Sequence, residues 1–271
     1  MSGFLDSMAV SSARRAAVAR RREPLSVLEA RARATPPAPP LRLSSGFDVI
    51  AELKLRSPAG GELGTAADDW AGRVAAYARG GAAAVSVLTE PSRFDGALEH
   101  LAHAARVLNP LGVPAMRKDF LVDPYQLAEA RAAGAGGALL IVRMLPAAQT
   151  AELLAAAADY GLFVLLEAFD AGDLAVAAQL LGARRADAPP VLIGINCRDL
   201  QTLKVVPARF EELAPHLPAG YAAVAESGVT SAAEARHVRG LGYGVALIGT
   251  ALMQHGVPER LLDEIIRAAR T

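Results

Sequence analysis

Short apolar runs alternate with longer Ala-rich stretches along the chain from residue 48 onward. The apolar runs predict eight strands, at residues 48–54, 83–90, 113–120, 137–143, 162–168, 191–197, 221–227 and 244–250. The stretches that follow them have helical spacing, at residues 66–80, 95–108, 123–133, 146–159, 170–182, 207–216, 230–240 and 257–270. The strand runs are nearly continuous, which is typical of parallel strands covered by helices.

Eight strands, each followed by a helix, over about 225 residues are the count of a (β/α)8 TIM barrel. A doubly wound sheet is the structural alternative, but the first predicted strand is not followed by the Gly-rich GxGxxG turn of that fold. We therefore expect an α/β protein with the barrel fold. Residues typical of helix starts and ends support the division: Asp123-Pro124, Pro146 and Pro207 at first turns, and Gly80-Gly81, Gly134, Gly161 and Gly182 at C-terminal caps.

The N-terminal segment differs from the rest of the chain. Residues 11–24 are rich in Arg, which superficially suits a transit peptide, but a solvated amphipathic helix is the interpretation we favour. Residues 35–40, TPPAPP, cannot continue a helix because stacked prolines lack the required N–H groups. We expect residues 1–45 to form a helical extension with a Pro-rich linker, and residues 46–271 to form the catalytic barrel.

Composition narrows the classes of partner. The 28 basic and 28 acidic side chains balance, so net charge gives no indication of nucleic-acid binding. No apolar run approaches the roughly 18 residues that a membrane helix needs. The single cysteine, Cys197, excludes an internal disulfide and suits a reducing compartment. We expect a cytoplasmic protein that acts on a small molecule, binds neither nucleic acid nor membrane, and is a monomer or weak homodimer.

Polar residues end most of the predicted strands. In chain order they are Glu52 with Lys54, Glu90, Lys118, Arg143, Glu167, Asn196 and Glu226. Because the active site of such a barrel lies at the C-terminal ends of its strands, we expect these residues to gather at one mouth. Each of them alone could be an ordinary loop charge, and only their joint occurrence favours a site.

The charged residues on alternate strands can share one layer of the barrel. They comprise two lysines and three carboxylates: Glu52, Lys54, Lys118, Glu167 and Glu226. The carboxylates should keep both lysines protonated, and their own pKa values should shift in different directions. This is a suitable set for general acid–base catalysis.

Two glycine-containing stretches predict a phosphate site. Ser227 and Gly228 follow the seventh strand, and Gly249 and Thr250 follow the eighth. Barrels of this kind bind phosphate at these loops through backbone N–H groups. Either glycine alone could simply end a turn, but their coincidence at this place favours a phosphorylated substrate.

No pattern indicates a metal or an organic cofactor, and we expect neither. All five histidines lie in predicted helical stretches; His100 and His103 have a spacing that could share a metal but lack carboxylate or Cys partners. Cys197 follows Asn196 and should point toward the helices as a packed core thiol. A Ser-His-Asp set, a P-loop and a dinucleotide fingerprint are also missing.

Eight motifs together resemble the indole-3-glycerol phosphate synthase family of tryptophan biosynthesis. In family order they are IAELKLRSPAGG, SVLTEPSRFDGA, MRKDFLVDPYQLAEARAAGA, LLIVRML, LLEAF, IGINCRDLQTL, VAESGV and LIGTALM. The resemblance implies a carbon–carbon lyase (carboxy-lyase). Its substrate is 1-(o-carboxyphenylamino)-1-deoxyribulose 5-phosphate, and its products are indole-3-glycerol phosphate, carbon dioxide and water.

The resemblance also implies roles for individual residues. Lys118 matches the general acid that protonates the substrate ketone, and Lys54 matches a lysine that holds the substrate's anionic groups and is a second candidate acid. Glu52 and Glu167 match carboxylates that position the lysines and serve in the dehydration. Asn196 and Glu226 match groups that orient the substrate's hydroxyls and anilino nitrogen. The residues that match the family's substrate and phosphate contacts are Ser57, Phe120, Arg198, Ser227, Gly228, Gly249 and Thr250.

The chain departs from the family pattern at Leu55, Ala59, Ala168-Phe169 and residues 134–137, none of which is a matched catalytic position. These departures leave open a divergent paralogue with the same reaction in a specialised pathway. A phosphoribosyl anthranilate isomerase shares the phosphate cradle but lacks the E-x-K and K-D-F motifs. A non-catalytic sugar-phosphate-binding barrel would keep the cradle and lose the acid groups, whereas this sequence keeps both.

Overall fold

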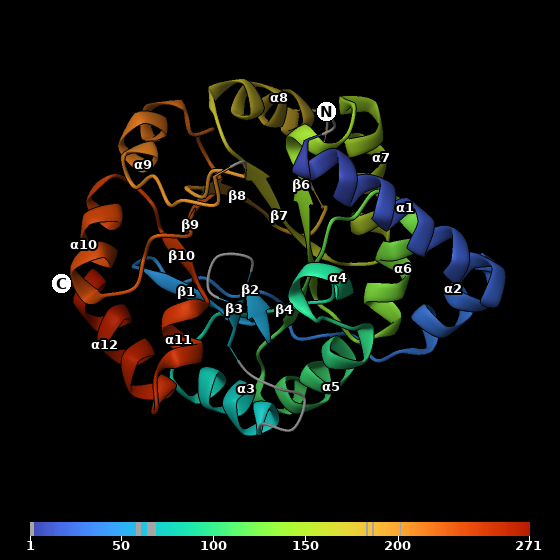
Figure 1. Cartoon of the computed structure of the whole chain (residues 1–271), viewed down its shortest axis with the longest axis horizontal. Helices are drawn as coiled ribbons and strands as arrows, with labels where there is room; N and C mark the ends of the chain where they lie inside the picture. Colours follow the sequence, from blue (N-terminus) through green and yellow to red (C-terminus); the bar gives the residue numbers. More distant parts are fainter. Residues whose placement is uncertain (1–2, 58–60, 64–68, 183, 186, 201) are drawn as a thin grey trace.

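Eight parallel strands close into a barrel in the computed structural model, which describes residues 3–57, 61–63, 69–182, 184–185, 187–200 and 202–271 (Figure 1). The barrel strands are β1 (Asp48–Leu53), β4 (Ala84–Leu88), β5 (Ala115–Lys118), β6 (Gly137–Ile141), β7 (Phe163–Ala168), β8 (Val191–Asn196), β9 (Ala222–Glu226) and β10 (Val245–Ile248). The first strand pairs with both β4 and β10, which closes the sheet. The predicted (β/α)8 fold is confirmed, and the doubly wound alternative is wrong.

Helices cover the outside of the barrel, one in each predicted helical stretch. They are α3 (Trp70–Arg79), α5 (Leu98–Leu108), α6 (Pro124–Ala132), α7 (Ala147–Asp159), α8 (Ala171–Gly182), α9 (Ala208–Leu213), α10 (Ala232–Gly240) and α12 (Pro258–Arg270). Short elements follow several strands: the hairpin β2 (Arg56–Ser57) and β3 (Gly61–Glu62), α4 (Pro91–Phe94), the 3-10 turn η2 (Val142–Met144) and α11 (Thr250–Gln254). Two further 3-10 turns, η1 (Asn109–Leu111) and η3 (Ala214–His216), follow α5 and α9. Within the described residues, no helix has both the length and the apolar character to cross a membrane.

Most of the predicted helix ends follow the expected chemistry. Asp123 caps α6 by accepting a hydrogen bond from the Tyr125 N–H at 2.8 Å, and Pro124 occupies the first helical position. The predicted cap at Gly182 is wrong, because Gly182 is the last residue of α8 and lacks the positive φ that Gly134 and other cap glycines adopt.

The burial of β1 explains its charged end. Val49 and Leu53 belong to the core between barrel and helices, whereas Ile50 belongs to the core inside the barrel. Because side chains alternate along a strand, Glu52 lies on the same inward face as Ile50. A charged residue therefore enters the barrel at its C-terminal end, where Lys54 lies 2.9 Å from it.

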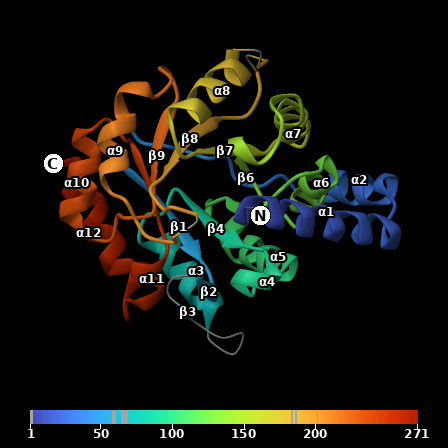
Figure 2. The ribbon, with the colours of Figure 1, turned by 45° about the horizontal axis from the view of Figure 1, so that its top comes forward.

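The N-terminal extension forms two helices, α1 (Phe4–Arg22) and α2 (Leu25–Ala34), which lie against α6 and the neighbouring side of the barrel (Figure 2). Both helices bury one face, at residues that include Met8, Ser12 and Leu28. The Gln126 side chain donates a buried hydrogen bond to the Ser12 hydroxyl at 2.8 Å. The predicted amphipathic helix is confirmed for the Arg-rich segment, and the structure adds that its buried face packs against the rest of the protein while its other face is solvated.

Candidate active site

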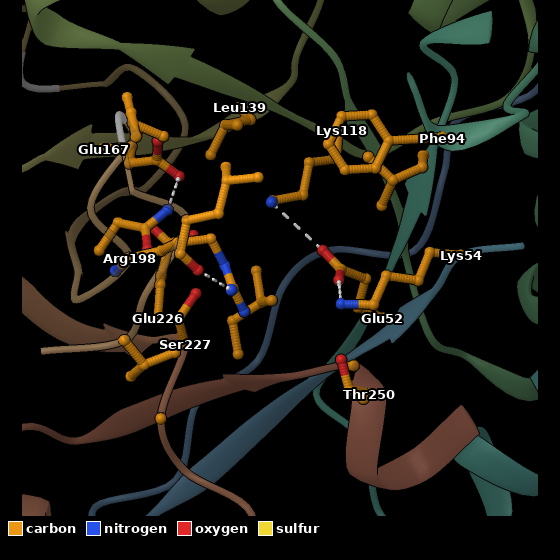
Figure 3. Close-up of a pocket in the computed structure, with 18 of the residues that line it drawn as sticks. Glu52, Lys54, Phe94, Lys118, Leu139, Glu167, Arg198, Glu226, Ser227 and Thr250 are labelled. Atoms are coloured by element: carbon orange, nitrogen blue, oxygen red, sulfur yellow. Dashed lines mark hydrogen bonds and ion pairs between the residues drawn. The ribbon is translucent and has the colours of Figure 1, made fainter. Parts of the chain in front are cut away.

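A cavity of about 470 Å³ opens at the C-terminal ends of the barrel strands (Figure 3). It contains nearly all the residues predicted to form the site: Glu52, Lys54, Lys118, Phe120, Glu167, Asn196, Arg198, Glu226, Ser227, Gly228, Gly249 and Thr250. The side chain of Ser57 and all of Ala59 lie outside the described part of the chain. Closure of the barrel thus brings together residues that are up to about 200 positions apart in sequence.

One side of the cavity, the lysine side, consists of Glu52, Lys54 and Lys118. The Glu52 carboxylate lies 2.9 Å from Lys54 Nζ and 3.2 Å from Lys118 Nζ, and the Glu52 side chain is only 4% exposed. Burial opposes ionisation of Glu52, but the two ammonium groups outweigh it and lower its pKa to about 2. Burial likewise opposes the charge on Lys118, but the surrounding carboxylates outweigh it and raise the Lys118 pKa. Both groups are therefore charged at neutral pH.

On the opposite side, Glu167 and Glu226 lie across the cavity from Lys118 and Glu52 (Figure 3). Together with Asn196 they form the carboxylate side. Asn196 donates a hydrogen bond from Nδ2 to Glu167 Oε2 at 3.2 Å and accepts one from the Arg198 N–H at 2.9 Å. Glu226 is buried, and neither of its carboxylate oxygens has a hydrogen-bond partner in the described part of the chain. Burial, with the nearby Glu167 charge added to it, raises the Glu226 pKa well above 4.5.

The predicted divergence of carboxylate pKa values is therefore confirmed for Glu52 and Glu226. Their shifts have opposite directions because two ammonium groups contact Glu52, whereas Glu226 is buried beside another carboxylate. The cavity can thus keep a fixed negative charge on one side while a carboxyl group on the other side retains its proton to higher pH.

Two glycines provide space for these charged side chains, because any side-chain carbon at their positions would collide with them. A Cβ at Gly249 would lie 2.5 Å from Glu52 Oε1 and 2.9 Å from Lys54 Nζ. A Cβ at Gly194 would collide with Glu226 Oε1. Gly249 was predicted only as a phosphate-binding residue, and Gly194 was not predicted. Its signal was available, because Gly194 precedes Asn196 by two residues and so shares its inward strand face.

The predicted phosphate loops have unusual backbone conformations. Gly228 adopts φ +93°, and Ser227 before it adopts φ +62°, which is uncommon for a residue with a side chain. Such conformations cluster at ligand-binding sites. The Arg198 guanidinium, from the loop after β8, is held by the Leu203 carbonyl at 2.8 Å.

An apolar wall completes the cavity and was not predicted beyond Phe120. The Phe120 ring packs edge-on against Phe4 of α1, with centroids 5.7 Å apart, and lies 6.3 Å from the ring of Phe94. Leu139 and Ile141 of β6 extend this wall. The wall can accept an aromatic ring, because ring pairs favour such edge and offset contacts.

Two strand-end residues predicted at the mouth do not line the cavity. Glu90 instead caps α4, where its carboxylate accepts hydrogen bonds from the N–H groups of Ser92 and Arg93 at 2.9 and 2.7 Å. Arg143 lies in η2, beyond the end of β6, and forms ion pairs with Asp170 and Asp173. In both cases the chain turns away from the mouth directly after the strand.

The remaining candidates lie outside the cavity. His100 and His103 pack edge-on against Trp70, with centroids 5.7 and 4.5 Å apart, and His255 follows α11 instead of lying in a helix as predicted. Cys197 is buried, and burial raises its pKa to about 12. Among the described residues, no group of three or more His, Cys, Asp or Glu side chains is arranged to hold a metal ion.

These features define a class of protein: a (β/α)8-barrel enzyme whose mouth combines lysines with buried carboxylates. The family model for indole-3-glycerol phosphate synthase matches residues 7–264, and the chain belongs to that family. Relatives named indole-3-glycerol phosphate synthase are 42% identical over 229 residues in Micrococcus luteus (84% of this chain, 80% of the relative) and 38% identical over 259 residues in Mycobacterium tuberculosis (94% and 91%).

Solved structures of other enzymes share the fold at much lower identity. The 3-hexulose-6-phosphate synthase of Salmonella typhimurium has a TM-score of 0.60 at 10% identity, covering 82% of this chain and 98% of its own. The tryptophan synthase of M. tuberculosis has a TM-score of 0.56 at 16% identity, covering 83% and 93%. At such identities the likeness supports the barrel fold alone.

Proposed function

We propose that the chain converts 1-(o-carboxyphenylamino)-1-deoxyribulose 5-phosphate into indole-3-glycerol phosphate, carbon dioxide and water. Membership of the indole-3-glycerol phosphate synthase family supports this reaction. The observation that carries the mechanism is the ion pair between Lys118 and the buried Glu52, 3.2 Å apart and facing a pocket with an aromatic wall. It supplies a charged proton donor beside the place where an aromatic substrate fits.

Ring closure is the first step that the residues must assist. The substrate's aromatic ring attacks the ketone carbon, and the ketone oxygen gains a proton as the carbon–carbon bond forms. Lys118 is the proposed donor because it is charged, largely shielded from solvent and fixed by the buried Glu52. The ring carbon that made the attack carries the carboxylate, and its loss as carbon dioxide returns the bonding electrons to the ring and restores aromaticity without an external electron acceptor.

Dehydration is the second step, and we assign it to the groups around the resulting hydroxyl. Loss of water needs a proton donor for the leaving oxygen and a base that removes the proton from the adjacent carbon, which completes the indole ring. Glu167 is the proposed base, held by Asn196, and Lys54 is the candidate acid. Glu226 orients the substrate by donating its retained proton, as its raised pKa favours.

Phosphate is proposed to bind at the loops after β9 and β10. Ser227, Gly228, Gly249 and Thr250 line this part of the cavity together with Arg198. The left-handed conformation of Gly228 allows close backbone approach to an anion. We also propose that the enzyme is cytoplasmic and acts as a monomer or weak homodimer.

A single assay tests the proposed function. Purified protein is mixed with the anilino-ribulose phosphate, and indole fluorescence is followed together with release of carbon dioxide. We expect both products in equal amounts. Tight binding of the substrate without either product would instead favour the non-catalytic sugar-phosphate-binding barrel. A divergent paralogue of a specialised pathway would give the same products. In that case, a strain that lacks the gene would still grow in medium without tryptophan.

A further inference from the structure

The carboxylate of Asp119, the residue directly after Lys118, is held by the N-terminal extension. Its side chain is 0% exposed. Arg15 of α1 donates to both carboxylate oxygens, from Nη1 at 3.0 Å and from Nη2 at 2.7 Å. A bidentate contact of this kind fixes the orientation of a carboxylate as well as its position.

The barrel adds contacts that connect the same carboxylate to the backbone of Lys118. Thr89 donates from its hydroxyl to Asp119 at 2.8 Å, and its N–H donates to the Lys118 carbonyl at 3.0 Å. Arg117 donates to Asp119 at 3.2 Å, and the Phe120 N–H donates to it at 2.8 Å. The segment from Arg117 to Phe120, which carries Lys118, is therefore held by the Asp119 carboxylate and by Thr89.

We propose that Arg15 is a positioning residue for Lys118. Asp119 follows the last residue of β5 directly, so the contacts that fix its carboxylate also fix the peptide that joins it to Lys118, and with it the direction in which Lys118 enters the cavity. Arg15 acts through Asp119 and lies outside the cavity lining. The role in catalysis rests on the proposed function, in which Lys118 donates a proton.

The same helix offers a matched control. Arg20 of α1 forms an ion pair with Asp123 at 2.6 Å, one helical turn and a half further along. These side chains are 48% and 28% exposed, and exposed pairs contribute little to stability. Replacing Arg20 therefore removes an α1-to-barrel ion pair without affecting the residue next to Lys118.

The experiment compares Arg15→Met, Arg15→Lys and Arg20→Met with the full-length wild type at a temperature where circular dichroism shows all of them folded. We expect Arg15→Met to lower kcat about tenfold to a hundredfold, as a misplaced catalytic group does, with KM changed less than threefold or so. Arg15→Lys keeps the charge but loses the two-point contact, so its kcat should lie between. Arg20→Met should match the wild type.

A second readout does not depend on turnover. Trinitrobenzenesulfonate labels lysine amines, and mass spectrometry gives the labelling rate at Lys118. We expect faster labelling in Arg15→Met than in Arg20→Met, because a less well-positioned Lys118 leaves Glu52 more often. Equal labelling in both variants overturns the inference even if Arg15→Met is inactive. An inactive wild type with faster labelling in Arg15→Met would overturn the proposed function and leave the positioning role supported.

Discussion

The lysine side and the carboxylate side of the cavity are built from similar residues and have opposite electrostatics. On the lysine side, Glu52 lies within 3.2 Å of two ammonium groups, and its pKa falls to about 2. On the carboxylate side, Glu226 has no hydrogen-bond partner among the described residues, and its pKa rises well above 4.5. Two glutamates at equivalent strand ends thus acquire different proton affinities from their neighbours alone.

The difference shows how one barrel mouth can hold a fixed charge and a transferable proton at the same pH. Desolvation acts on both carboxyl groups in the same direction, so the sign of each shift depends on whether a cation is within contact distance. The lysine side is suited to stabilise negative charge that develops on a substrate oxygen, and the carboxylate side is suited to hold or accept a proton.

Removing the donor from the lysine side should have the largest effect. Lys118→Met keeps most of the side-chain volume, and we expect kcat to fall about 10²–10⁴-fold with substrate affinity retained within about tenfold. Lys54→Met should weaken binding as well, if Lys54 holds the anionic groups of the substrate as the family resemblance implies. Single-turnover rates and equilibrium binding measure the two effects. Near-normal turnover in Lys118→Met would identify Lys54 as the leading candidate acid.

The comparison also predicts opposite pH dependences of stability. Because the folded pKa of Glu52 is lowered from 4.5 to about 2, its stabilisation is present above pH 4.5 and is lost as the pH falls toward 2. Glu52→Gln should therefore lower the free energy of unfolding by about 3–5 kcal/mol at neutral pH, since it breaks a buried ion pair. The deficit should shrink below pH 4.5.

Glu226→Gln should behave in the reverse manner. The folded pKa of Glu226 is raised, so the contribution of this carboxyl group to wild-type stability is fully present below pH 4.5 and is lost as the pH rises through the raised pKa. Gln does not titrate, so the stability of the variant should rise relative to the wild type over that pH range. Urea unfolding across a pH series checks both variants. Parallel pH dependences in Glu52→Gln and Glu226→Gln would contradict the electrostatic difference between the two sides.

Adding one methyl group to each side should separate their kinetic roles. Gly249→Ala places a carbon 2.5 Å from Glu52 Oε1, and Gly194→Ala places one against Glu226, so each should displace its own glutamate. We expect kcat to fall about tenfold to a hundredfold in both. Gly240→Ala is the control, since no described atom lies within 4 Å of its added carbon. A rise in KM alone for Gly249→Ala would mean that this glycine serves only phosphate.

Removal of the extension should have the smallest effect on the fold. All eight strands lie beyond residue 45, so a chain that begins at residue 35 should still show a cooperative thermal transition. Its activity should fall several-fold or more, because Phe4 leaves the cavity wall and Arg15 leaves Asp119, both next to the lysine side. A truncated chain that fails to fold would contradict the predicted division at residue 45.

Much of this architecture could be predicted from sequence because the relevant signals are local. Continuous apolar runs, helical spacing and residues such as Asp123 at a helix start identify eight β/α units without any knowledge of contacts. Barrel geometry then places every strand end at one mouth. That rule alone predicted the location of residues such as Lys118 and Glu226 in a common cavity.

The tertiary structure decided what local signals do not contain. Glu90 and Arg143 also follow strands, but the chain turns at once and directs them to a helix cap and to an ion pair outside the cavity. The space at Gly194 depends on the distance between two neighbouring strands, and the Arg15–Asp119 contact joins residues 104 positions apart. Sequence determined which polar residues follow strands, because strand direction is a local property. The pKa of Glu226 and the placement of Lys118 required the closed barrel, since they depend on neighbours that only long-range packing supplies.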